Sequence, residues 1–124
     1  MAFSSLRFAD VVLVAPEGRI DHASAEPLQQ ALAPIVGDGS GDTQALLLDF
    51  SCLEYISSVG LRVVMMASKQ LRARQARIAV AGMQPVVLEI FQITRFNHVV
   101  EIFPSVAEAL AALSAPAAAA YQSR

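Results

Sequence analysis

Hydrophobic and polar positions along the chain follow two different periods, which predicts short strands separated by longer helices. Five runs rich in apolar and β-branched residues have the length of strands and are bounded by turn residues. The third run is apolar on both alternating faces until Asp49, as expected for a central strand covered by helices on each side. The strands are expected at residues 4–8, 11–15, 45–50, 78–81 and 99–103.

Four other segments carry apolar residues at helical spacing. Asp21 or Ser24 can cap the first, and Pro27 is expected in its first turn, where a missing N–H is tolerated. Ser57 or Ser58 begins the second, a proline opens the third, and a Ser-x-x-Glu capping box precedes the fourth. The helices are expected around residues 25–35, 58–74, 85–93 and 106–113.

The order of these elements predicts one α/β domain. The first two strands form an antiparallel hairpin, and the β-α-β-α-β order that follows requires right-handed crossovers and parallel strands. The expected fold is a mixed, mostly parallel sheet of about five strands with about four helices. We place this domain at residues 1–114, followed by a flexible Ala-rich tail at residues 115–124. Residues 37–42, which contain three glycines, are expected to be a flexible loop.

Composition and charge narrow the range of possible functions. A chain of 124 residues with 55% hydrophobic and 16% charged residues has the makeup of one folded domain. Its formal charge of -2 gives no counterion-release drive toward nucleic acid. A single cysteine, Cys52, excludes an internal disulfide and thiolate metal sites. No export signal and no membrane-spanning run is present in the sequence, so we expect a cytoplasmic protein that does not insert into membranes.

The candidate chemistry lies where the central strand leads into the second helix. In open α/β sheets, sites form at the carboxyl ends of parallel strands, and here that edge holds residues 51–58 with four hydroxyl groups. Ser57 and Ser58 could serve only as helix caps, worth about 1 kcal/mol. An enzyme would need Ser58 as nucleophile with His22 or His98 as base, but no Gly-x-Ser-x-Gly elbow is present. No metal-ligand or cofactor motif is present either, so we expect neither an enzyme nor a cofactor.

Four short motifs, taken in their order and spacing, resemble the STAS domain of anti-sigma factor antagonists. The resemblance runs from about Val11 to Leu113, and its motifs lie at residues 18–21, 49–62, 80–85 and 91–94. It implies a small α/β module that binds partner proteins without catalysis. In this family an anti-sigma factor that is also a serine kinase phosphorylates a hydroxyl at the start of the second helix. The unmodified form captures that kinase and frees a sigma factor.

The resemblance also implies which residues act. Ser58 is similar to the phosphorylated position of some members, and Ser57 is the alternative; sporulation-type members have Asp-Ser-Ser-Gly-Leu where this chain has residues 57–61. The turn at residues 18–21 should lie beside the helix start. The expected partner-binding residues are Asp21, His22, Ser57, Ser58, Val59, Arg62 and Met66. As alternatives, Asp21 would be only a helix cap, His22 a solvated loop residue, and Met66 an ordinary packing residue.

The partners implied are an anti-sigma factor serine kinase and a serine phosphatase that reverses the modification. An alternative is that the chain resembles small STAS proteins that serve as cytoplasmic subunits bound to the ATPase of an ABC-type lipid-transport complex. A homodimer through exposed Met and Ala surfaces is a further expectation.

Two further sequence features are a cluster of basic residues and an arginine at a turn. Four cations, Lys69, Arg72, Arg74 and Arg77, lie within nine residues. We interpret them as a solvated helix face followed by a turn, with contact to acidic lipid headgroups as the alternative. Arg95 stands where the family often has glycine, and a positive φ there would strain it mildly.

Overall fold

The computed structural model describes residues 3–37 and 42–123. Most of the loop expected at residues 37–42 lies outside the described residues. The elements along the chain are β1 (Phe3–Phe8), β2 (Val11–Pro16), β3 (Gly18–Ile20), α1 (His22–Val36), β4 (Ala45–Asp49), β5 (Leu53–Ile56), α2 (Ser58–Ala73), β6 (Arg77–Ala81), α3 (Pro85–Ile93), the 3-10 helix η1 (Phe96–His98), β7 (Glu101–Phe103), α4 (Val106–Leu113) and α5 (Ala115–Gln122).

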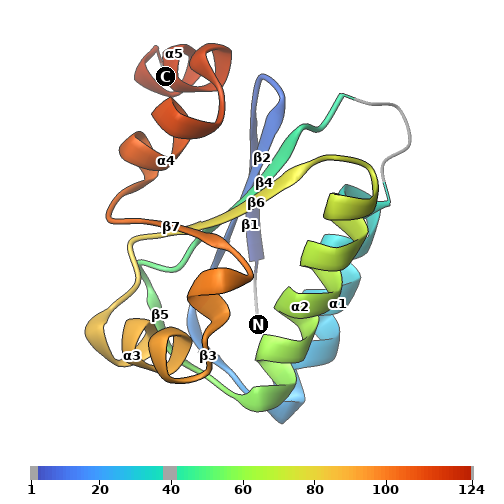
Figure 1. The fold of residues 1–124 in the computed structure, drawn as a ribbon, viewed down its shortest axis with the longest axis vertical. Coiled ribbons are helices and arrows are strands. Elements are labelled where there is room, and N and C mark those ends of the chain that lie inside the picture. Colours follow the sequence, from blue (N-terminus) through green and yellow to red (C-terminus); the bar gives the residue numbers. More distant parts are fainter. Residues whose placement is uncertain (1–2, 38–41, 124) are drawn as a thin grey trace.

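The main sheet has five strands in the order β1-β2-β4-β6-β7. Strands β1 and β2 pair antiparallel from Phe3↔Pro16 to Phe8↔Val11, and the remaining pairs are parallel. The predicted mixed sheet with one antiparallel hairpin is therefore confirmed. Figure 1 shows helices α1 and α2 together on one side of this sheet and α4 and α5 on the other.

The sheet is buried on both faces because its central strands are apolar throughout. Leu46 and Leu48 of β4 belong to the core beneath α1, α2 and α3, whereas Leu47 belongs to the core beneath α4 and α5. All three leucines have no exposed surface. The period of two along each strand sends successive side chains to opposite faces, so one apolar strand supplies two cores.

A second, two-stranded parallel sheet was not predicted. Gly18 pairs with Leu53 and Ile20 with Ile56, which joins β3 to β5. The sequence analysis expected a turn at residues 18–21 and no strand within residues 51–58. Strands of three and four residues are too short to show a period, and this pair forms because the neighbouring helices hold the segments together.

The expectation of a flexible tail at residues 115–124 is corrected by the structure, which has helix α5 over most of this segment. Ala117 is fully buried, and the rings of Phe8 and Tyr121 meet edge to face at 5.4 Å. Ser114 both caps α5 and donates a 2.5 Å hydrogen bond from its hydroxyl to the Asp10 carboxylate. The described residues thus form five α-helices instead of about four, and the fifth covers the β1 side of the sheet.

Local signals explain where the helices begin. Asp21 is the N-cap of α1, accepting from the backbone N–H groups of Ala23 and Ser24, while the Ser24 hydroxyl accepts from the Asp21 N–H. Because the helix begins at His22, Pro27 lies in the second turn and not in the first as expected.

The last strand is shorter than predicted because Val99 and Val100 belong to the turn that follows the 3-10 helix η1, where the N–H groups of both donate to the Phe96 carbonyl oxygen. Arg95, at the start of η1, has φ = 63°, the positive value that would strain a residue other than glycine. The structure thus supports the mild strain anticipated at this position.

Two arginines of the basic segment, Arg74 and Arg77, donate hydrogen bonds to backbone carbonyl groups at helix ends. Arg74 donates to the carbonyl oxygens of Ile35 (3.1 Å), Val36 (3.2 Å) and Thr43 (3.0 Å), which caps the carboxyl end of α1. On the other face of the sheet, Arg77 likewise donates to a carbonyl oxygen at the carboxyl end of a helix, α4.

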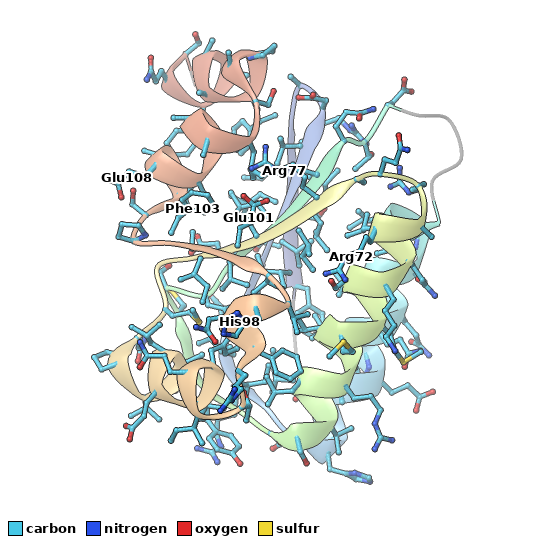
Figure 2. The ribbon with its side chains drawn as sticks, viewed as in Figure 1. Arg72, Arg77, His98, Glu101, Phe103 and Glu108 are labelled. Atoms are coloured by element: carbon cyan, nitrogen blue, oxygen red, sulfur yellow. The ribbon has the colours of Figure 1, made fainter. Side chains whose placement is uncertain are left out.

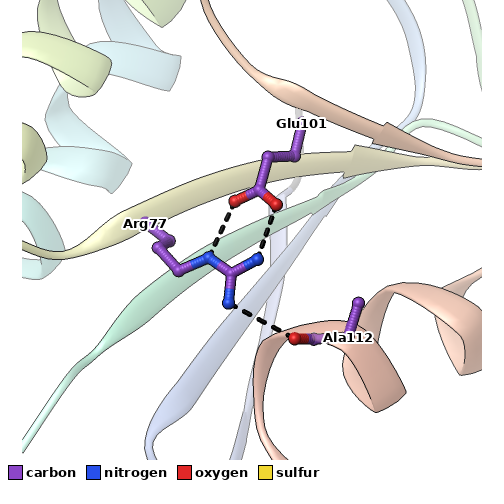
Figure 3. A network of polar contacts seen from close by, with 3 residues as sticks. All are labelled: Arg77, Glu101 and Ala112. Carbon is purple, nitrogen blue, oxygen red and sulfur yellow. Dashed lines mark hydrogen bonds and ion pairs between the residues drawn. The ribbon is translucent and has the colours of Figure 1, made fainter.

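Arg77 donates to the carbonyl oxygen of Ala112 in the last turn of α4, at 3.3 Å, and pairs with both carboxylate oxygens of Glu101 (Figure 3). The hydrogen bonds to Glu101, together with its negative charge, raise the pKa of the Arg77 guanidinium above its ordinary value. The pair is nearly half exposed, so its own contribution to stability is small. The expectation of a solvated face therefore does not hold for half-buried Arg74, whereas Lys69, Arg72 and Arg77 are exposed.

We expect Arg74→Ala to lower the free energy of unfolding by about 1–3 kcal/mol, because three carbonyl oxygens lose a charged donor. Lys69→Ala removes a cation from the same segment at an exposed position and should change stability by less than about 0.5 kcal/mol. Urea unfolding followed by circular dichroism measures both. Equal effects of the two substitutions would show that Arg74 has no capping role.

Candidate functional site

Two helix N-termini meet at one corner of the molecule. The pairing Ile20↔Ile56 places the ends of β3 and β5 side by side, and the Ser57 N–H donates to the Ile20 carbonyl oxygen at 2.8 Å. Each strand then leads directly into a helix, so α1 and α2 begin next to each other (Figure 1). We call the residues at these two starts, Asp21, His22, Ser57, Ser58 and Val59, the α1–α2 corner.

The two serines of the corner have different environments. Ser57 is the N-cap of α2, half-buried, and its hydroxyl accepts from the Gly60 N–H at 3.2 Å. Ser58 is the first residue of the helix and is exposed, and within the described part of the chain its hydroxyl makes no hydrogen bond. A modifying enzyme could reach Ser58 without disturbing the cap.

The electrostatics of the corner are set by Asp21 and by the helix ends. Hydrogen bonds from the Ser24 backbone and hydroxyl and from the Ala23 N–H, with the nearby Arg19 charge, lower the pKa of Asp21. Asp21 therefore remains a carboxylate at neutral pH. Arg19 itself lies 4.4 Å above the ring of Tyr55, on the neighbouring strand. The helix dipoles direct positive potential toward the same corner.

Gly60 fixes how closely α2 approaches the β3–β5 pair. A Cβ atom at this position would lie 2.6 Å from Cγ2 of Ile20 and 2.8 Å from Cγ1 of Ile56. Real Cβ contacts are essentially never under 3.0 Å, and both isoleucines are buried. The sequence interpretation that this glycine allows close packing of the helix is supported by the geometry.

A groove between α1 and α2 runs away from the corner. It has a volume of about 560 Å³, and four predicted partner-binding residues line it: His22, Val59, Arg62 and Met66. Met66 is 41% exposed, although most of its helix neighbours on the core side are buried. Of the seven predicted residues, five lie at the two helix starts, and Arg62 and Met66 lie further along the groove, which His22 and Val59 also line.

The sequence analysis missed an apolar surface on α3. This helix has six hydrophobic residues among nine, yet Val87 and Phe91 alone are buried. Val86 is 57% exposed and Ile93 72% exposed, on the side of the helix away from the core. Helix α3 packs against β5, the strand that leads to Ser57 (Figure 1). A helix that is apolar on all sides normally is buried, and this signal was readable in the sequence.

Of the two bases in the enzyme alternative, His98 is not brought together with Ser58, whereas His22 lies with Ser58 in the α1–α2 corner. Figure 2 shows His98 on η1, where it lines a separate open cleft of about 640 Å³ with Arg72, Arg77 and Glu101. That cleft lies beside the second half of α2, whereas Ser58 begins the helix. No group of three potential metal ligands occurs among the residues that the structure describes. None of the described helices is long and apolar enough to cross a membrane.

Comparison with known proteins agrees with this geometry. The family model for the STAS domain matches residues 5–109. BtrV of Bordetella bronchiseptica, named as an anti-sigma factor antagonist, is 40% identical over 88 residues, covering 71% of each chain. The anti-sigma-B factor antagonist of Listeria monocytogenes is 30% identical over 97 residues, covering 77% of this chain and 82% of the relative.

Solved structures match as well. An anti-sigma factor antagonist from Mycobacterium paratuberculosis superposes with a TM-score of 0.81 at 25% identity, covering 90% of this chain and 92% of the other. Proteins of this named class are regulators and not enzymes. With the family model spanning most of the sequence and two relatives at 30% identity or more, the chain belongs to the STAS domain family.

Proposed function

We propose that this chain binds an anti-sigma factor that is also a serine kinase, and thereby releases a sigma factor for transcription. The α1–α2 corner is the contact, and phosphorylation of Ser58 by the same kinase breaks it. A serine phosphatase restores the binding form. The proposal extends the general role of the named relatives, anti-sigma factor antagonism, to a specific partner and residue.

The observation that carries the proposal is the separation of roles between neighbouring hydroxyls. Ser57 is engaged in the cap, whereas Ser58 is exposed and has no intramolecular hydrogen bond within the described residues. Phosphorylation adds about 1.5 to 2 negative charges, and a helix N-terminus accommodates negative charge. The modification can therefore change recognition without unfolding the domain.

Asp21 and the α3 surface support a contact at this end of the molecule. Asp21 keeps a fixed negative charge at the corner because its pKa is lowered. Val86 and Ile93 add exposed apolar area on the helix that packs against β5. Partner interfaces commonly combine an apolar patch with charged groups at its edge.

The test is phosphorylation mapping. The purified protein is incubated with the serine-kinase anti-sigma factor of the same bacterium and ATP, and the phosphopeptide is located by mass spectrometry. We expect phosphate on Ser58, none in Ser58→Ala, and retained phosphate on Ser58 in Ser57→Ala. Phosphate on Ser57 would contradict Ser58 as the phosphorylation site. Failure of the unmodified protein to bind the kinase would reject the proposed function.

The alternative function, an accessory subunit bound to a transporter ATPase, predicts a different outcome. Such a subunit would bind the ATPase equally before and after treatment with the serine kinase. The relatives reported above carry the name of anti-sigma factor antagonists, which favours the kinase as partner.

A further inference from the structure

The groove between α1 and α2 is longer than the corner requires. Beyond the 560 Å³ section next to His22 and Val59, a second section of about 70 Å³ continues toward Val36 and Gln70. The two sections share Gln29, Ala33, Val63 and Met66, so they form one continuous groove. From Val59 to Gln70 is eleven residues of α2, or about 16 Å of helix at ~1.5 Å per residue.

The floor of this groove is apolar and its rim is polar. Val63 and Ala67 from α2 and Leu32 from α1 form a buried floor, and Met66, which is 41% exposed, lines both sections of the groove. Flexible, polarizable Met side chains suit surfaces that adapt to a partner. The rim carries the amides of Gln29, Gln30 and Gln70 and one charge from each helix, Glu26 on α1 and Arg62 on α2.

Both walls of the groove are α-helices, which decides what can occupy it. Backbone N–H and C=O groups in the middle of a helix are hydrogen-bonded within that helix. An extended peptide in this groove would therefore find no backbone partners, whereas its own amides would lose water. A helix brings a satisfied backbone and presents an apolar ridge.

On the basis of the proposed function, we infer that the α1–α2 groove receives an amphipathic helix of the anti-sigma factor. The groove opens at His22, Val59 and Arg62, which belong to or adjoin the proposed contact, so one partner can cover both. About three turns of helix fit its length. Aliphatic side chains at i, i+3, i+4 and i+7 contact Met66 and the floor, and flanking residues of either charge meet Glu26 and Arg62.

The first experiment places a charge in the groove. We expect Met66→Glu to weaken binding of the purified serine-kinase anti-sigma factor at least tenfold by isothermal titration calorimetry, because the carboxylate would be covered by apolar side chains. The matched control is Lys69→Glu, which introduces a carboxylate at an exposed position of the same helix that does not line the groove. It should change the affinity by less than threefold, and thermal unfolding checks that both variants fold.

The second experiment identifies the occupant. Gln70→p-benzoylphenylalanine places a photo-crosslinker at the end of the groove remote from Ser58. In the complex it should cross-link to a helical, amphipathic segment of the kinase. Cross-linking to a strand or loop, or to nothing, overturns the inference.

The two proposals fail in different ways. Unchanged affinity of Met66→Glu together with a large loss in Ser58→Asp would reject the helix in the groove and leave the proposed function intact. Absence of any binding by the wild-type protein would reject the proposed function itself.

Discussion

Ser58→Asp should weaken binding of the anti-sigma factor kinase about a hundredfold while the fold remains intact. One negative charge placed about 6 Å from a partner carboxylate, at an effective dielectric constant near 20, costs about 3 kcal/mol, which corresponds to that factor in Kd. Ser58 is exposed at the first position of α2, where a negative charge is favourable, so thermal unfolding should shift by no more than a few degrees. Titration calorimetry and a melting curve on the same sample measure both quantities.

Two variants control this experiment. Ser58→Ala has no charge and cannot be phosphorylated, and it should keep binding after incubation with the kinase and ATP. Ser5→Asp adds the same charge on the exposed edge strand β1 and should leave Kd unchanged. Equal affinities of the wild type and Ser58→Asp would reject the phosphorylation switch.

Gly60→Ala should lower the free energy of unfolding by about 2 kcal/mol, even though alanine is the better helix former. The gain in helix propensity is at most about 1 kcal/mol. Against it stands a new Cβ 2.6 Å from Ile20 and 2.8 Å from Ile56, and overpacking of this kind typically costs about 1–3 kcal/mol, more where both neighbours are fully enclosed. The melting temperature should fall by roughly 6–10 °C.

A double-mutant cycle identifies the cause. In the background of Ile20→Ala, which removes the nearest atom, Gly60→Ala should cost clearly less than in the wild type. The same cost in both backgrounds would show that the steric explanation is wrong. Because the backbone N–H of residue 60 donates to the Ser57 hydroxyl, a shift of α2 that relieves the new Cβ contacts should disturb this cap and reduce partner binding in addition.

Elements with strong end signals were predictable from the sequence. Helices α3 and α4 have the expected bounds, because a proline opens the first and the Ser105 hydroxyl, accepting from the Glu108 N–H, caps the second. The parallel strands β4, β6 and β7 followed from apolar runs joined by helical crossovers. In each case the information lies within a few residues of the feature.

Features that depend on tertiary contacts were not predictable in the same way. Strand β3 has three residues and exists as a partner of β5. Helix α5 is built from alanines with no apolar stripe, and it is ordered by the burial of Ala117 and the Phe8–Tyr121 contact, between residues more than a hundred positions apart.

For the site, sequence and structure contributed different parts. The motifs pointed to residues 57–62 and left Ser57 and Ser58 as alternatives, and the structure adds that Ser57 is engaged in the cap whereas Ser58 is exposed. The anchoring roles of Arg74 and Arg77 required coordinates, since their acceptors are carbonyl groups at distant helix ends. The exposed Val86 and Ile93 were missed because the sequence analysis treated α3 only as a packing element.

The neighbouring hydroxyls at the α2 start have an evolutionary consequence. The Ser57 hydroxyl caps the helix, and the Ser58 hydroxyl makes no hydrogen bond within the described residues. Selection on foldability therefore acts on Ser57 and leaves Ser58 free to vary. A lineage could lose, regain or retune its sensitivity to a kinase by one substitution at position 58, without passing through an unstable ancestor.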